Sequence, residues 1–219
     1  MNAPFCSFDK HSVCVFVEKL SDGSNHALGS GCFFMKRDIV LTAKHVLEEA
    51  VENKKPVFIA NGSENGKLFG ARPLRFYPHP EIDLALVQVS TEGLKIDHPF
   101  YPSHFALNET TGTVAAGYDR NASDNVNNSW VVGLHRIESF EIERREHRLG
   151  SKEYTLHFEA PWIEPGCSGG PVITAGGGVA AVLIQGFANV KDSAETSPKN
   201  FGRATSIYPM VDAFHSPFE

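Results

Sequence analysis

The sequence predicts an all-β protein. Short apolar segments recur along the whole chain, turn residues separate nearly all of them, and a long helical pattern of apolar residues is almost absent. The chain has 219 residues, of which 42% are hydrophobic and 21% charged, so it is long enough to bury a substantial core. One large β unit or two smaller barrels that share a core fit this length, and the class is a barrel or a sandwich.

Six strands are predicted in each half of the chain. In the first half they cover residues 12–17, 32–35, 39–42, 56–60, 67–76 and 84–89. In the second half they cover residues 113–117, 131–140, 154–159, 171–174, 179–184 and 204–207. Residues 43–53 favour a short helix, and residues 208–214 predict a second one at the end. The charged residues 141–148 are predicted as a solvated hairpin.

A division into two domains follows from residues 91–112, which contain Gly, Pro, His and Asn without clear periodicity. The first domain is predicted to cover residues 1–97 and the second residues 113–219. Residues 98–112 are then the crossing between them.

Charge and composition exclude several classes of protein. A formal net charge of −6, without a run of Lys or Arg, argues against a nucleic-acid partner. No stretch of apolar residues is long enough to predict a membrane span, and residues 1–10 lack the basic and apolar regions of a signal peptide. The cysteines form no C-x-x-C motif, so reduced thiols, a cytoplasmic location and the absence of a metal or other cofactor are expected. These cysteines are Cys6, Cys14, Cys32 and Cys167.

The segment 165–171, which reads Pro-Gly-Cys-Ser-Gly-Gly-Pro, is the first candidate for chemistry. Glycines at positions −2, +1 and +2 let the backbone bend sharply around Ser168, so that N–H groups beside it can converge on one point. Such convergence is what an oxyanion requires. Taken alone, the segment is equally typical of a linker or a hairpin loop.

Two further segments carry a candidate base and a candidate carboxylate. His45 follows the apolar run 39–42, and Asp83 precedes the apolar run 84–89. Each has an ordinary explanation by itself, as a packed or surface histidine and as a turn aspartate. Together with Ser168 they occur in the order His, Asp, Ser, which is the order in chymotrypsin.

These three segments resemble the motifs T-A-A-H-C, D-I-A-L and G-D-S-G-G-P of trypsin/chymotrypsin-like serine peptidases. The bacterial members and the heat-shock serine proteases, which often read G-x-S-G-G-P, are more similar still. Residues 29–34 and 202–207 also resemble that group, so the resemblance extends over residues 28–212. It implies two packed six-stranded antiparallel β-barrels, a short C-terminal helix and an active site between the barrels. It also implies a serine endopeptidase that acts on protein or peptide substrates through an acyl-enzyme.

The resemblance assigns a role to each candidate residue. It makes Ser168 the nucleophile, His45 its general base and Asp83 the group that orients the imidazole. The backbone N–H groups of Gly166 and Ser168 would form the oxyanion hole. Cys167 stands where most animal members have an Asp that pairs with a new N-terminal amine, so a directly competent or ligand-gated state, with a regulatory protein or ligand as partner, is expected.

The resemblance also locates a primary specificity pocket. The residue six positions before the nucleophile, Trp162, would lie at its base. An apolar base predicts cleavage after small or medium apolar residues, because a buried cation needs an acidic partner. A register shift of two residues would place Glu164 there and favour basic residues instead. The walls would come from Ile184, Gln185, Gly186, Gly202 and Ala204.

Two alternative functions remain open at the sequence level. A protease-like domain can bind peptides or partners without cutting them. Residues 166–170 also satisfy G-x-S-x-G, and Asp192 and His215 follow in the order of an α/β-hydrolase-type esterase. That fold requires a helix after the serine, whereas both flanks here predict strands.

Overall fold

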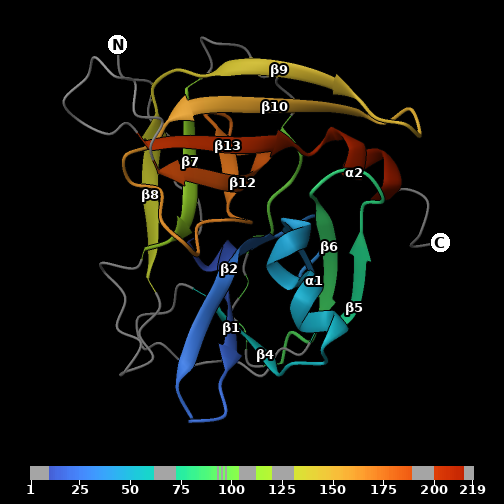
Figure 1. Ribbon diagram of the computed structural model, residues 1–219, viewed down its shortest axis with the longest axis vertical. Helices are drawn as coiled ribbons and strands as arrows, with labels where there is room; N and C mark the ends of the chain where they lie inside the picture. Colours follow the sequence, from blue (N-terminus) through green and yellow to red (C-terminus); the bar gives the residue numbers. More distant parts are fainter. Residues whose placement is uncertain are drawn as a thin grey trace.

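Two antiparallel sheets, each built from one half of the chain, make up the protein (Figure 1). The computed structural model describes residues 10–61, 73–92, 94, 96, 98–103, 112–119, 131–188 and 200–214. Within this part of the chain the helices are too short and too polar to span a membrane. The described residues also contain no group of three or more His, Cys, Asp or Glu side chains that could hold a metal ion.

The first sheet has six strands in the order β4-β1-β2-β3-β6-β5. A short 3-10 helix, η1 (Lys10–Ser12), leads into it, and the helix α1 (Lys44–Glu52) follows β3. Every neighbouring pair of strands is antiparallel. The strands are β1 (Val13–Lys19), β2 (Asn25–Phe33), β3 (Ile39–Thr42), β4 (Val57–Asn61), β5 (Pro73–Pro78) and β6 (Ala85–Val89).

The second sheet has seven strands in the order β8-β7-β11-β12-β13-β10-β9. The helix α2 (Tyr208–Phe214) follows its last strand, at the position predicted for a C-terminal helix. The strands are β7 (Thr113–Tyr118), β8 (Val132–Ile137), β9 (Glu141–Glu146), β10 (Lys152–Glu159), β11 (Pro171–Thr174), β12 (Val179–Ala188) and β13 (Asn200–Ser206).

The all-β class and the chymotrypsin-like arrangement of two sheets are confirmed, but two details of the prediction are wrong. The second sheet has seven strands instead of six, because the charged segment expected to be a solvated hairpin adds β9 to the sheet. In addition, strand pairing within the described residues does not close either sheet into a barrel. The first sheet ends at β4 and β5, and the second ends at β8 and the fully exposed β9.

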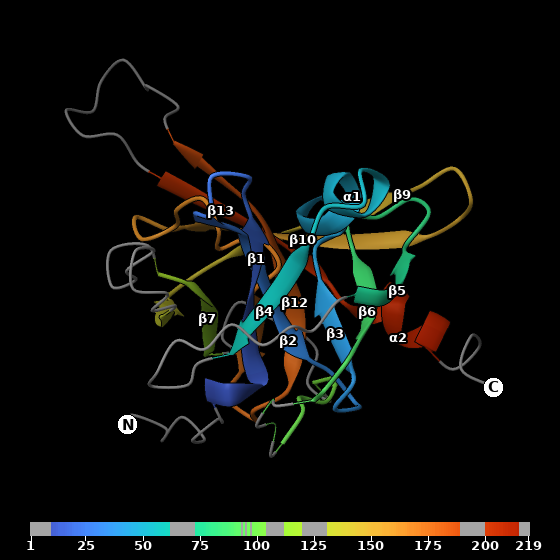
Figure 2. The ribbon, with the colours of Figure 1, turned by 90° about the horizontal axis from the view of Figure 1, so that it is seen from below.

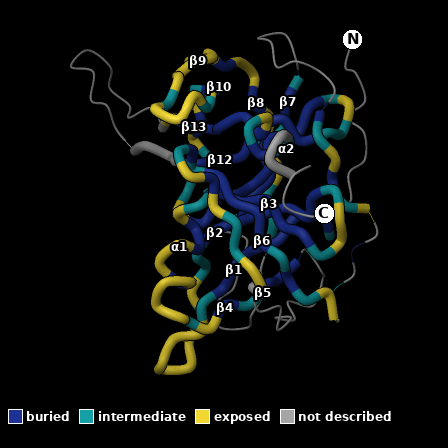
Figure 3. The backbone as a smooth tube through the Cα atoms, turned by 90° about the vertical axis from the view of Figure 1, so that its right-hand side faces the viewer, coloured by how far each residue is buried: buried dark blue, intermediate teal, exposed yellow. Residues whose placement is uncertain are grey.

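The largest hydrophobic core joins the two sheets. It contains Phe16 and Leu41 from the first sheet together with Val182 and Ile184 from β12 of the second. A second cluster, around Phe158, lies within the second sheet. Figure 2 shows the two sheets from below. β3, most of β6 and the second half of β2 are buried, whereas every residue of β9 and several residues of α1 are exposed (Figure 3). The division at residues 97 and 113 stays a prediction.

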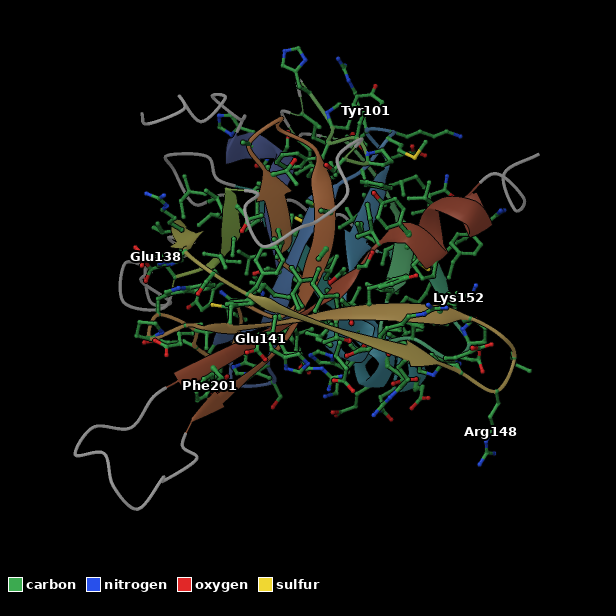
Figure 4. All side chains as sticks on the ribbon, turned by 90° about the horizontal axis from the view of Figure 1, so that it is seen from above. Tyr101, Glu138, Glu141, Arg148, Lys152 and Phe201 are labelled. Carbon is green, nitrogen blue, oxygen red and sulfur yellow. The ribbon has the colours of Figure 1, made fainter. Side chains whose placement is uncertain are left out.

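The long β9–β10 hairpin is anchored at its far end. Arg148 projects from its tip away from the body of the molecule (Figure 4). The N–H of Leu149 donates to Glu81 Oε1 at 2.6 Å, and the buried Glu153 accepts from Thr205 Oγ1 at 2.7 Å and contacts His147 Nε2 at 2.8 Å. The Leu149–Glu81 bond joins the tip of the hairpin to the loop that precedes Asp83, and the Glu153–Thr205 bond joins the hairpin to β13.

Candidate functional site

His45 lies in the first turn of α1. The helix begins directly after β3, whose four residues are all buried, so the chain leaves the core at this point. The N-cap residue, Ala43, offers no side-chain hydrogen bond to the free N–H groups of the first turn. The His45 side chain is 45% exposed and therefore accessible to a substrate.

Asp83 lies on the loop between β5 and β6. Two buried residues, Ile82 and Leu84, flank it and anchor the loop in the core. His79 holds the same loop from within, since its Nδ1 accepts hydrogen bonds from the N–H groups of Glu81 at 3.2 Å and Ile82 at 3.0 Å. These contacts fix the turn that carries the carboxylate of Asp83.

Asp83 binds His45 at two points. Its Oδ2 lies 2.6 Å from His45 Nδ1, and its Oδ1 accepts from the His45 backbone N–H at 3.0 Å. The second contact supplies the cap that Ala43 lacks and places a negative charge at the helix N-terminus, where it is favourable. Burial raises the pKa of Asp83, but the hydrogen bonds from the His45 side chain and N–H outweigh it, so the pKa lies below its usual value.

The turn that carries Ser168 is fixed by its own backbone and by β12. The N–H of Cys167 donates to Glu164 O, and the N–H of Gly170 donates to Cys167 O, both at 3.1 Å. Gly169 N donates to Leu183 O at 2.7 Å. Gly166 and Gly169 have φ values of 104° and 88°, a backbone region that residues other than glycine rarely adopt.

The backbone N–H groups of Gly166 and Ser168 are available on this turn. Within the described part of the chain, neither donates a hydrogen bond to another protein group. Gly166 is buried and Ser168 half-buried, and because buried N–H groups are normally paired, a free donor at Gly166 is unusual. Both N–H groups are suited to an acceptor that is not part of the fold.

Ser168 Oγ contacts a backbone carbonyl and does not reach His45. It donates to Ile184 O at 3.5 Å, and the described residues contain no hydrogen bond between Ser168 Oγ and His45. The two segments are nevertheless neighbours, because a Cβ added to Gly29 would lie 2.7 Å from Val46 and 2.8 Å from the Ser168 carbonyl. The structure thus joins His45 to Asp83 and brings Ser168 near them without completing the third contact.

The thiol of Cys167 is bonded to the backbone of β7. Its Sγ donates to Tyr118 O at 3.2 Å, and the residue is buried. Burial raises the pKa of the thiol, so the reactive thiolate is disfavoured.

Two of the residues predicted to form the specificity pocket, Trp162 and Gly202, lie beside one aromatic cluster. Trp162 stacks on His135, with ring centroids 4.3 Å apart and an interplanar angle of 2°, and its ring lies 6.3 Å from that of Phe158. The ring of Phe158 also covers Gly202, where an added Cβ would lie 2.4 Å from it. The predicted wall positions are placed by strand pairing or by burial. Ile184 and Ala204 are buried, while Gln185 and Gly186 pair with Arg203 and Gly202 across β12 and β13.

The sequence did not indicate the residues that support the Ser168 turn from the first sheet. Ser30 and Thr42 are both fully buried there and bonded to each other, and the N–H of Tyr118, on β7, donates to Ser30 Oγ. The available signal was the serine in Gly29-Ser30-Gly31, whose flanking glycines allow close approach of other backbone.

The helix that an α/β-hydrolase requires after its serine is not found. Ser168 is followed by the strand β11. Asp192 and His215, the other two residues of that alternative, lie outside the described residues.

Comparison with known proteins agrees with the fold and with the motifs. A family model described as "Trypsin-like peptidase domain" matches residues 29–182, well over half of the chain. Solved structures similar in fold include Deg5, with a TM-score of 0.55 at 18% identity over 80% of each chain. A thermostable serine protease from an extremophilic microorganism, AL20, has a TM-score of 0.56 at 16% identity over 89% of this chain and 91% of its own.

The HtrA-type protease AlgW, solved with a decapeptide, has a TM-score of 0.60 at 16% identity. The match covers 94% of this chain and 64% of AlgW, so this chain spans slightly less than two thirds of that protein. At these identities the structures establish similarity of fold, including similarity to HtrA-type proteases. The match of the family model establishes more: this chain belongs to the trypsin-like peptidases and is, as a member of that family, a serine-type endopeptidase.

Proposed function

We propose that the protein hydrolyses peptide bonds through an acyl-enzyme on Ser168, with His45 as general base and Asp83 as the residue that orients it. The observation that carries this proposal is the double contact of Asp83 with the ring and the backbone N–H of His45. A carboxylate at Nδ1 favours the tautomer that is protonated there, which leaves Nε2 free to accept a proton.

The reaction begins with a change at Ser168. A serine hydroxyl is a weak nucleophile near neutral pH and needs a base within hydrogen-bond reach. Rotation of the Ser168 side chain away from Ile184 O would bring its Oγ toward Nε2 of His45. Oγ then attacks the scissile carbonyl while His45 takes its proton and passes it to the leaving amine, and water later releases the acyl group by the same route.

The N–H groups of Gly166 and Ser168 are assigned the role of stabilising the negative charge on the tetrahedral intermediate. Both donors are free of protein acceptors within the described residues, and both belong to a turn held by several backbone bonds. Donors fixed in advance stabilise developing charge without reorganisation, which is commonly the largest contribution to catalysis. Protein or peptide substrates fit this chemistry, and the decapeptide solved with AlgW supports a peptide ligand.

A fluorophosphonate probe tests the proposal, because it reacts with an activated serine and with little else. We expect label on Ser168, located by peptide mapping, and a fall in turnover of about a millionfold in Ser168→Ala. Ser12→Ala is the matched control, since Ser12 is a buried serine whose hydroxyl donates to a backbone carbonyl, that of His98, and has no assigned role in the site. Label on another residue, or an active Ser168→Ala variant, would contradict the assignment.

The contact between Ser168 Oγ and Ile184 O favours a second candidate function. In that case the resting site is gated by a regulatory protein or ligand, or the domain binds peptides without cutting them. A folded protein that binds a peptide library but never takes up the probe would support binding alone. Labelling that appears only after a peptide is added would support gating.

A further inference from the structure

Ser30, on β2 of the first sheet, makes four hydrogen bonds that meet at the candidate site. Its Oγ donates to Gly166 O at 2.7 Å and accepts from Tyr118 N at 2.9 Å. Its own N–H donates to Ser168 O at 2.6 Å, and its carbonyl accepts from Thr42 Oγ1 at 2.7 Å. The residue is fully buried, so every polar atom of Ser30 is engaged within the protein.

The bond to Gly166 O acts on one particular peptide plane. That plane joins Gly166 to Cys167, and it is held at one end by Ser30 and at the other by the bond from Cys167 N to Glu164 O. The N–H of Gly166 belongs to the plane before it, and the N–H of Ser168 belongs to the plane after it. The held plane therefore lies between the two candidate oxyanion donors and sets their relative direction.

Gly166 offers little intrinsic resistance to rotation of that plane. It has no Cβ, and its φ of 104° is a conformation that glycine can leave easily. Tyr118 packs against it so closely that an added Cβ would lie 2.4 Å from the ring. Because the Tyr118 N–H is itself bound to Ser30 Oγ, one hydroxyl restrains both the glycine and the residue that covers it.

We propose that Ser30 is a positioning residue for the oxyanion hole, through which the first sheet holds the donors carried by the second. This inference rests on the proposed function of Gly166 and Ser168. It assigns to Ser30 no contact with substrate. It predicts that loss of the hydroxyl affects the transition state, in which the oxyanion is charged, more than the binding of the uncharged substrate.

The variant Ser30→Ala removes the hydroxyl and leaves the backbone bonds of residue 30 in place. We expect kcat to fall by about 10- to 100-fold, because a donor displaced by about 1 Å loses much of its effect, while KM stays within about twofold. Inhibition by a peptide aldehyde, which forms a charged tetrahedral adduct, should weaken by the same factor as kcat. Ser12→Ala, which also loses one buried hydroxyl bond to a carbonyl, should keep wild-type kcat and inhibition.

The outcomes separate a positioning role from a structural one and from failure of the proposed function. Partial recovery of kcat in Ser30→Thr, which restores a hydroxyl, supports positioning. Wild-type kcat and aldehyde inhibition in Ser30→Ala, or a loss confined to KM, overturns it. If wild-type protein is labelled at Ser168 and Ser30→Ala is labelled at the same rate, the inference alone fails; if wild-type protein is labelled elsewhere, the proposed function fails.

Discussion

The carboxylate of Asp83 binds both the imidazole and the backbone N–H of His45, at 2.6 and 3.0 Å. Asp83→Asn replaces the charged acceptor at Nδ1 with an amide that can present its NH₂ group to the ring. We expect turnover to fall by about four orders of magnitude, because the imidazole then adopts the wrong tautomer. Steady-state kinetics and the rate of fluorophosphonate labelling measure the effect.

Asp38→Asn is the matched control for that substitution. Asp38 also accepts a side-chain hydrogen bond in the first sheet, from Gln88 Nε2 at 3.0 Å, and no catalytic role is assigned to it. It should retain wild-type turnover. Near-normal activity in Asp83→Asn would return Asp83 to a purely local role in the turn.

The folded protein should become less stable at acidic pH because of His79. Burial lowers the pKa of this histidine most, with Glu81 opposing that shift, and Nδ1 is already occupied as an acceptor of two N–H groups. A folded pKa below the unfolded one means that the unfolded chain binds more protons. The contribution of His79 to the free energy of unfolding is therefore complete above its pKa in the unfolded chain, about 6.5, and is lost as pH falls through its pKa in the folded protein.

Urea denaturation between roughly pH 5 and 8 measures this dependence. His79→Asn supplies an uncharged acceptor and should reduce the loss of unfolding free energy at the acidic end. Part of the loss should remain, because burial also lowers the pKa of His135. An identical pH profile in wild type and variant would exclude His79 as its source.

Two glycines with nearly the same φ should respond very differently to alanine. Gly169, at φ 88°, would place a Cβ 1.9 Å from Ser30 O and 2.3 Å from Thr42 Oγ1, whereas Gly23, at φ 86°, has nothing within 4 Å. We expect Gly23→Ala to cost only the backbone conformation, about 1–2 kcal/mol. Gly169→Ala should cost about 4 kcal/mol or more, and equal melting temperatures for the two variants would refute the predicted collision.

Cleavage is expected after small or medium apolar residues. The rings of Trp162 and Phe158 lie close together, and Phe158 covers Gly202 on a neighbouring strand. Phe158→Ala should widen the preference toward larger apolar residues while leaving a core cavity that costs about 3–5 kcal/mol. Profiling of a denatured protein mixture tests both statements, and cuts mainly after Lys or Arg would overturn the apolar preference.

The sequence predicted the helices and strands whose apolar pattern is visible within the segment, and it missed strands whose formation depends on pairing with a neighbouring strand. β11 (Pro171–Thr174) and α2 (Tyr208–Phe214) were predicted with the observed bounds. β2 was predicted only from residue 32, although it begins at Asn25, because its glycine-rich first part is held by pairing with β1. β9 was missed as a strand because all its residues are exposed, so its sequence shows no apolar face.

In the candidate site, too, the residues in local motifs were predicted and the contacts between distant segments were not. His45, Asp83 and the Ser168 turn could be found because each lies in a short motif with its own order along the chain. The rotamer of Ser168 and the contacts of Ser30 could not, since they depend on how β2, β7 and the turn pack. A pattern of residue types carries no information about which carbonyl a buried hydroxyl will meet.

The hydroxyl of Ser30 joins partners that are 136 and 88 positions away along the chain. Contacts between such distant positions form late in folding, because the entropy of closing long loops must first be offset by other contacts. During synthesis the first half leaves the ribosome well before the Ser168 turn has been made. We therefore expect a nascent or half-folded chain to be unable to cut its neighbours, and proteolytic competence to be the last property that the molecule acquires.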